Sequence, residues 1–92
     1  MTSDRPDDED GERAEAALGR VLIEASDRAR ERDAGGVRER IDRVERRIDD
    51  LDDEELAARL RHGCGAVRRV VDDEPLVAAA YLDAMRRRVA GE

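Results

Sequence analysis

The segment GVRERIDRVERRIDDL, residues 36–51, carries the clearest structural signal in this chain. Its five apolar residues recur at alternating spacings of four and three, and every position between them is charged. They are Val37, Ile41, Val44, Ile48 and Leu51. This spacing places all five side chains on one narrow face of an α-helix, as in a coiled coil or the outer helix of a bundle. The segment therefore predicts a helix over about 36–50 that buries one stripe against other helices.

The regions on both sides of this segment are also expected to be helical. They are dense in alanine, leucine, arginine and glutamate, which are strong helix formers. The breaks fall at DAGG (33–36), DLDDEE (50–55) and DDEP (72–75), where turn residues or capping carboxylates suit helix ends. We expect three more helices, over about 12–33, 53–72 and 74–90. The first would bury Ala14, Leu18, Val21, Leu22, Ala25 and Ala29.

The short connections between these helices favour antiparallel neighbours. The sequence therefore predicts an all-α fold, a small antiparallel bundle of about four helices arranged as two αα-hairpins. The 92 residues leave room for one such domain, over residues 12–91. Residues 1–11 precede it as a leader that is acidic, contains Pro6 and Gly11, and is expected to be disordered.

The charge composition indicates the kind of solvent in which this protein works. Charged residues make up 47% of the chain, with 25 acids and 18 bases, and the net charge is −7. All the bases are arginine, and lysine is absent. Dense carboxylates keep a surface hydrated in concentrated salt, so we expect a halophilic, haloarchaeal cytosol. The leader lacks the basic start and apolar run of a signal peptide, and no stretch is apolar enough to span a membrane, so a cytoplasmic location is predicted.

The segment RLRHGCGAV, residues 59–67, contains the only histidine and the only cysteine. On a continuous helix, side chains two positions apart diverge by about 200°, so His62 and Cys64 cannot share an ion or form a thiolate–imidazole pair. We therefore expect Cys64 in the core, His62 in solvent, and Gly63 at a close approach of a neighbouring helix. In the alternative interpretation the helix ends at His62 and restarts at Gly65. The two side chains could then approach each other.

The remaining residues offer little catalytic chemistry. The hydroxyl groups are limited to Thr2, Ser3, Ser26 and Tyr81. The chain has no HExxH or CxxC motif and no glycine-rich phosphate loop. We expect no enzymatic activity, no catalytic residue, no cofactor and no metal site.

The segment PLVAAAYLDAM, residues 75–85, contains more apolar surface than one helix face needs. Seven uncharged residues run without interruption from Leu76 to Leu82. The expected core face of this helix consists of Val77, Ala78, Tyr81, Leu82, Met85 and Val89. A second, outward face is then formed by Leu76, Ala79, Ala80, Asp83 and Arg87, with Ile23 of the first helix as a further candidate. A helix that is apolar nearly all round is buried on more than one side.

We therefore expect this outward face to pack on a second chain, as a homodimer or with a partner protein. In the alternative, the bundle itself wraps the fourth helix on all sides. The predicted function is a protein–protein interaction or regulatory module. The second hypothesis is a nucleic-acid-associated protein that uses Arg86, Arg87 and Arg88. An isoelectric point near 4.8, the absence of lysine and the single aromatic residue argue against that hypothesis.

Overall fold

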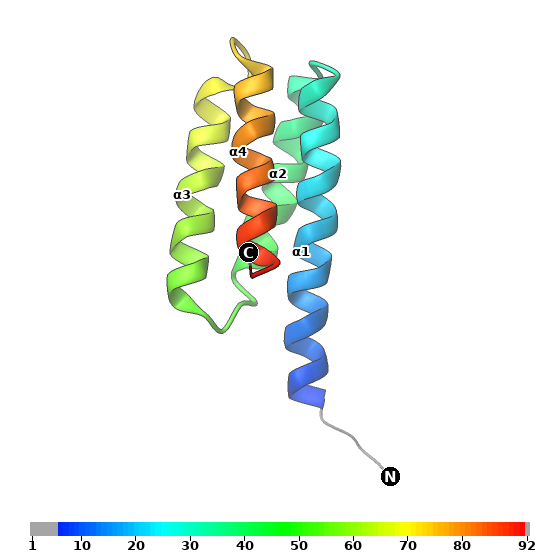
Figure 1. Cartoon of the computed structure of the whole chain (residues 1–92), viewed down its shortest axis with the longest axis vertical. Helices are drawn as coiled ribbons and strands as arrows, with labels where there is room; N and C mark the ends of the chain where they lie inside the picture. The colour runs from blue at the N-terminus through cyan, green and yellow to red at the C-terminus, as the bar shows by residue number, and fades with distance from the viewer. Residues whose placement is uncertain (1–5, 92) are drawn as a thin grey trace.

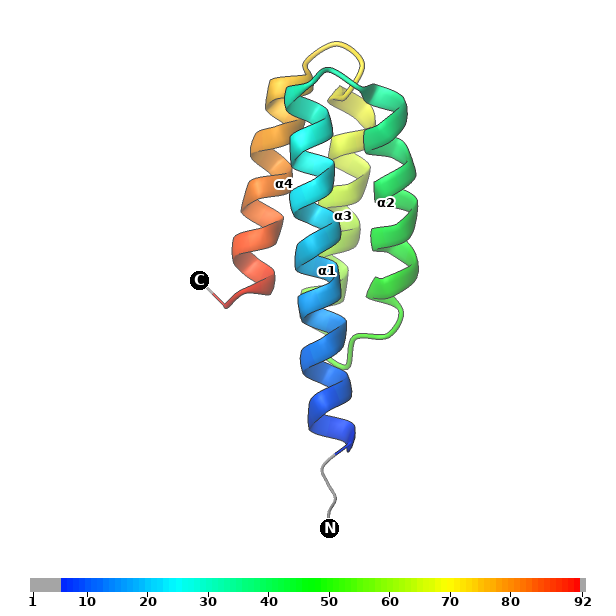
Figure 2. The same cartoon turned by 90° about the vertical axis from the view of Figure 1, so that its right-hand side faces the viewer.

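The protein is a bundle of four α-helices in the computed structural model, which describes the backbone of residues 6–91 and the side chains of residues 14–91. The helices are α1 (Pro6–Arg30), α2 (Ala34–Ile48), α3 (Glu54–Val70) and α4 (Pro75–Val89). Successive helices run in opposite directions; α1 packs against α2 and α4, and α3 packs against the same two helices (Figures 1 and 2). The predicted all-α antiparallel bundle of two hairpins is confirmed. No helix within the described residues is long and apolar enough to cross a membrane.

The ends of α2, α3 and α4 lie within two residues of the predicted ones, whereas α1 differs at both ends. It begins at Pro6, so residues 6–11 of the predicted leader form its first turns, and these project beyond the rest of the bundle (Figure 1). Proline is favoured at the first helical position, and acidic residues next to it suit the helix dipole. Residues 1–5 of that leader lie outside the described residues.

The connection between α1 and α2 is a tight turn made three residues earlier than predicted. Arg32 adopts φ 61°, the left-handed conformation. The amide of Asp33 donates to the carbonyl of Arg28 at 2.9 Å, and the amide of Arg32 donates to that of Ala29 at 3.0 Å. These two bonds form a Schellman motif, in which glycine is the usual left-handed residue. The chain therefore turns with an arginine at the position that glycine favours.

The two glycines that follow this turn lie inside the first turn of α2. The side chain of Asp33 caps the helix by accepting a hydrogen bond from the amide of Gly36 at 2.9 Å. A Cβ atom on Gly36 would collide with the Asp33 carboxylate, whereas one on Gly35 would have its nearest neighbour at 3.9 Å. Gly36 therefore lets the capping carboxylate approach. Asp53 caps α3 in the same way, on the amide of Leu56 at 3.1 Å.

The core runs along the bundle axis and is aliphatic. Ala25, Ala29, Ala57 and Ala78 are buried in it and allow neighbouring helices to approach. Its largest fully buried side chains are Leu18, Leu22, Ile41, Ile48, Leu60, Leu82, Val37, Val44, Val67, Val71 and Cys64. The single aromatic residue, Tyr81, is 43% exposed, so the described core is built without an aromatic ring.

Charged side chains link α2 to the neighbouring helices on both of its sides. Arg68 of α3 reaches Asp42 at 2.6 Å and Glu45 at 2.8 Å, and Arg38 of α2 makes two hydrogen bonds with Asp72, at 2.9 and 2.6 Å. Hydrogen bonding to Arg38 lowers the pKa of the Asp72 carboxyl. These arginines join α2 to the α3 side of the bundle through solvent-accessible pairs, each of which contributes little to stability.

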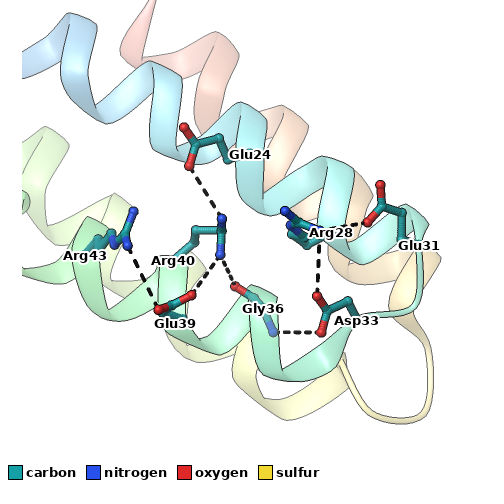
Figure 3. Close-up of polar contacts among 8 residues, drawn as sticks. All are labelled: Glu24, Arg28, Glu31, Asp33, Gly36, Glu39, Arg40 and Arg43. Carbon is teal, nitrogen blue, oxygen red and sulfur yellow. Dashed lines mark hydrogen bonds and ion pairs between the residues drawn. The ribbon is translucent and has the colours of Figure 1, made fainter.

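On its other side, α2 is tied to α1 by Arg40 (Figure 3). The Nε atom of Arg40 lies 3.5 Å from a carboxylate oxygen of Glu24, and its Nη1 atom lies 2.9 Å from Glu39 and 3.4 Å from the carbonyl of Gly36. The Arg40 side chain is only 16% exposed, so its aliphatic stem covers the edge of the core between α1 and α2.

Candidate functional site

The fourth helix carries three regions of different character along its length. It follows an acidic connection that ends with Asp73 and Glu74, and its helical residues start with Pro75 at the position where proline fits best. Its middle is apolar, and its last turn carries Arg86, Arg87 and Arg88. The last helical residue of α4 is Val89, and Gly91, two residues further on, adopts φ 83°, the left-handed conformation that glycine favours.

The inner face of α4 is rotated relative to the predicted one. The buried residues are Ala78, Ala79, Leu82, Met85 and Val89. Ala79 is 3% exposed, so its expected place on the outward face is wrong. Val77 and Tyr81, which were expected in the core, are 39% and 43% exposed, so that expectation is wrong as well. The reason is that α1 and α3 flank α4, and together they cover a different arc of the helix from the arc that the sequence predicts to face the core.

The outer face of α4 is apolar and free of any other helix. In Figure 1 it points toward the viewer between α3 and α1, and in Figure 2 nothing of the described chain lies outside it. Leu76 is 56% exposed, and Ala80 and Ala84 are exposed beside it. We call this surface the α4 face; it consists of Leu76, Val77, Ala80, Tyr81 and Ala84. The alternative in which the bundle wraps α4 on all sides is therefore not observed.

Three of the four exposed large hydrophobic side chains among the described residues belong to the α4 face. The fourth is Ile23, which is 47% exposed. Elsewhere the apolar stripes of the helices are turned inward, and the outward positions are mostly charged. A contiguous apolar patch on a soluble domain marks a binding surface more often than isolated exposed residues do.

Asp83 was expected on the outward face but is engaged in a bridge to α1. Its Oδ1 atom accepts a hydrogen bond from the Ser26 hydroxyl at 2.7 Å, and its Oδ2 atom accepts one from Arg30 at 2.5 Å. Arg30 also donates to the Ser26 hydroxyl oxygen. Partial desolvation alone would raise the pKa of Asp83, but the hydrogen bonds from Ser26 and Arg30 and the charges of Arg30 and Arg86 together lower it. The bridge therefore holds an ionised carboxylate against α1.

Ile23 and Arg87 are both exposed, but they lie in different surroundings. Ile23 lines a groove of about 390 Å³ between α1 and the last turn of α4, together with Gly19, Arg86 and Val89. This groove shares no lining residue with the α4 face. Arg87 lies on the same helix as the α4 face, beyond its apolar part.

The arginine cluster proposed for nucleic acid does not form a uniformly basic surface. Arg86 is half-buried in the α1–α4 groove, while Arg87 and Arg88 are exposed. Arg88 borders a hollow that is also lined by Arg59 and by three carboxylates, those of Glu15, Asp53 and Glu55. Phosphate binding needs a basic face, and these carboxylates would repel the phosphates of a nucleic acid. The geometry therefore gives this hypothesis little support.

The helix that carries His62 and Cys64 is continuous, as predicted, through both Gly63 and Gly65. Cys64 is fully buried and His62 is exposed, so the two side chains point to different surroundings. Burial raises the pKa of the Cys64 thiol to about 12, and the nearby Glu45 carboxylate acts in the same direction. Among the described residues, no group of three or more His, Cys, Asp or Glu side chains is placed to hold a metal ion.

Sequence reasoning missed Val77, Tyr81 and Ala84 as members of the α4 face. In a run that is apolar at every position, periodicity does not indicate which arc faces inward. One signal was available in Tyr81, because a tyrosine in a core without other polar groups leaves its hydroxyl unpaired. A tyrosine therefore indicates the solvent side of such a run.

The chain belongs to the family described as a domain of unknown function (DUF8101), whose model matches residues 2–91. No curated protein and no solved structure matches it.

Proposed function

We propose that this member of the DUF8101 family is a non-enzymatic protein-interaction or regulatory module of a halophilic cytoplasm, and that the α4 face is its docking surface. The observation that carries the proposal is the grouping of Leu76, Val77 and Tyr81, all substantially exposed, on two successive turns of one helix. Full burial of such a side chain contributes about 1.5–3 kcal/mol. Covering these three half-exposed side chains therefore gains a few kcal/mol, which can support a specific but reversible contact.

A partner protein with a helical or flat binding surface would fit the α4 face. The two grooves that border the last turn of α4 include no residue of this face, and its side chains are aliphatic or phenolic, without the convergent polar groups that hold a small ligand. An apolar helix face is a common recognition element for another helix.

The proposal is tested by site-specific photo-crosslinking in cells that naturally produce the protein. A photoreactive phenylalanine derivative replaces Tyr81 in one variant and Arg47, an exposed residue of α2, in the control. We expect a discrete covalent adduct from position 81 that is missing from position 47. Crosslinking that is absent at position 81, or equal at both positions, would overturn the proposed function. The mass of the adduct also shows whether the occupant is a second copy or another protein.

A further inference from the structure

The charges that flank the α4 face are arranged so that the face complements itself. Asp73 and Glu74 stand before its apolar part, and Arg87 and Arg88 stand after it; all four are exposed. No salt bridge joins any of these four side chains to another within residues 14–91, where Arg38, Arg61 and Arg68 of the α2–α3 side are each paired with a carboxylate. The face therefore has one acidic end, one apolar middle and one basic end.

A second copy packed antiparallel on this face pairs each acidic end with a basic end and each apolar middle with the other apolar middle. With a two-fold axis passing between Ala80 and Tyr81, Val77 of one copy lies opposite Ala84 of the other, and Glu74 lies opposite Arg87. Glu74 and Arg87 are 13 positions apart, a helical rise of about 20 Å, so both ends meet when the apolar middles overlap. A parallel arrangement would instead place arginines against arginines and carboxylates against carboxylates. Isologous contacts of this kind close as a dimer and do not propagate.

We propose that the occupant of the α4 face is a second copy of this chain, packed antiparallel with the acidic start of each α4 against the basic end of the other. This inference rests on the proposed docking function of the α4 face and names its partner. The fifteen residues of α4 span only about 22 Å, so the interface is small and the dimer is weak and reversible. A dimer of this strength can exchange its second copy for another chain with the same pattern of charges.

The first experiment measures the mass of the full chain by sedimentation equilibrium from about 10 to about 500 µM, a range suited to a small interface. It is carried out at about 2 M salt and at the lowest salt at which circular dichroism shows a folded protein. We expect a monomer–dimer equilibrium. Ala80→Glu should weaken the dimer at least tenfold, whereas Ala58→Glu, at an exposed alanine of α3, should leave it unchanged. A strictly monomeric protein, a larger oligomer, or equal effects of the two substitutions would overturn the inference.

The second experiment tests the antiparallel arrangement by charge reversal. One variant carries Asp73→Arg and Glu74→Arg, and the other carries Arg87→Glu and Arg88→Glu. Each variant alone places like charges against each other, so its dimer should be weakened, most strongly at low salt, where charges are least screened. An equimolar mixture of the two should restore the dimer at low salt, because both ends are then paired. A mixture that associates no better than the separate variants would overturn the antiparallel arrangement.

The two proposals fail in different ways. A monomeric protein that still gives an adduct with another protein at position 81 would overturn the second copy as occupant and leave the docking function standing. A monomeric protein without a specific adduct would overturn both.

Discussion

Gly63 of α3 lies directly against Met85 of α4. A Cβ atom on Gly63 would be 2.8 Å from the Met85 sulfur, closer than real Cβ contacts allow, and 3.0 Å from the Met85 Cγ atom. A Cβ atom on Gly65, two residues further along α3, would have its nearest neighbour, a guanidinium nitrogen of Arg69, at 3.6 Å. The predicted close approach at Gly63 is therefore confirmed. The absence of a side chain at this position allows α4 to lie close to α3.

Substitution of these two glycines by alanine should have different effects. Alanine in a helix interior is favoured over glycine by about 1 kcal/mol, so Gly65→Ala should raise the unfolding free energy by about that amount. Gly63→Ala forces Met85 to move, at a cost of about 1–3 kcal/mol, and should therefore be the less stable variant by at least 1 kcal/mol. Urea unfolding checks the order. Equal stabilisation by both substitutions would contradict the contact, and in a Met85→Ala background the difference should shrink.

Arg32 offers a second position where the backbone predicts a stabilising change. Its φ of 61° is the only positive value of a non-glycine residue within the described chain. The left-handed conformation costs a residue with a Cβ atom about 1–2 kcal/mol relative to glycine. Glycine keeps only part of this advantage, because it loses more conformational entropy on folding. Arg32→Gly should thus raise the unfolding free energy by about 0.5–1 kcal/mol. Glu31→Gly, at the neighbouring position, serves as the control and should be destabilising.

The bridge from Asp83 to Ser26 and Arg30 predicts a pH dependence. Because the native pKa of Asp83 is lowered, its stabilising effect is present above the unfolded-state pKa of about 4 and is lost as the pH falls through the lower native value. Asp83→Asn should reduce the unfolding free energy by about 1 kcal/mol at pH 7. The difference from the wild type should shrink as the pH falls through the lowered native pKa of Asp83. Asp72→Asn, at a more solvent-accessible ion pair, should change stability less. A difference for Asp83 that grows toward acid pH would contradict the bridge.

Cys64 should be inert in the folded protein. Its thiol is fully buried and has a pKa of about 12, so almost no thiolate is present at pH 8. A disulfide reagent should label it at least about a thousandfold more slowly in the native protein than in denaturant, because the thiolate is the reactive form. The control is Ala58→Cys in a Cys64→Ala background, where the thiol is exposed and labels rapidly. Native Cys64 that reacts as fast as this control would show that α3 opens readily.

Much of the fold follows from local pattern. The four apolar residues of α2 from Val37 to Ile48 are fully buried, as their spacing predicts, and Leu51 is half-buried behind them. The capping carboxylates Asp33 and Asp53 mark two helix starts in the same direct way. These features depend on residues within one or two turns of each other, so the sequence alone is enough to predict the helix starts and the buried stripe. The same holds for the opposite directions of His62 and Cys64, which the 100° rotation per residue determines once the helix is continuous.

The orientation of α4 could not be obtained in this way. Its apolar run presents nearly equal surface on every side, so periodicity leaves its rotation about its own axis undetermined. That rotation is set by contacts with distant parts of the chain: Met85 packs against Gly63, and Asp83 is held by Ser26 and Arg30. These contacts bury Ala79 and expose Val77 and Tyr81. Residue order alone thus determined that α4 has surplus apolar surface, whereas the packing of α1 and α3 on two of its sides decided which part of that surface remains for a partner.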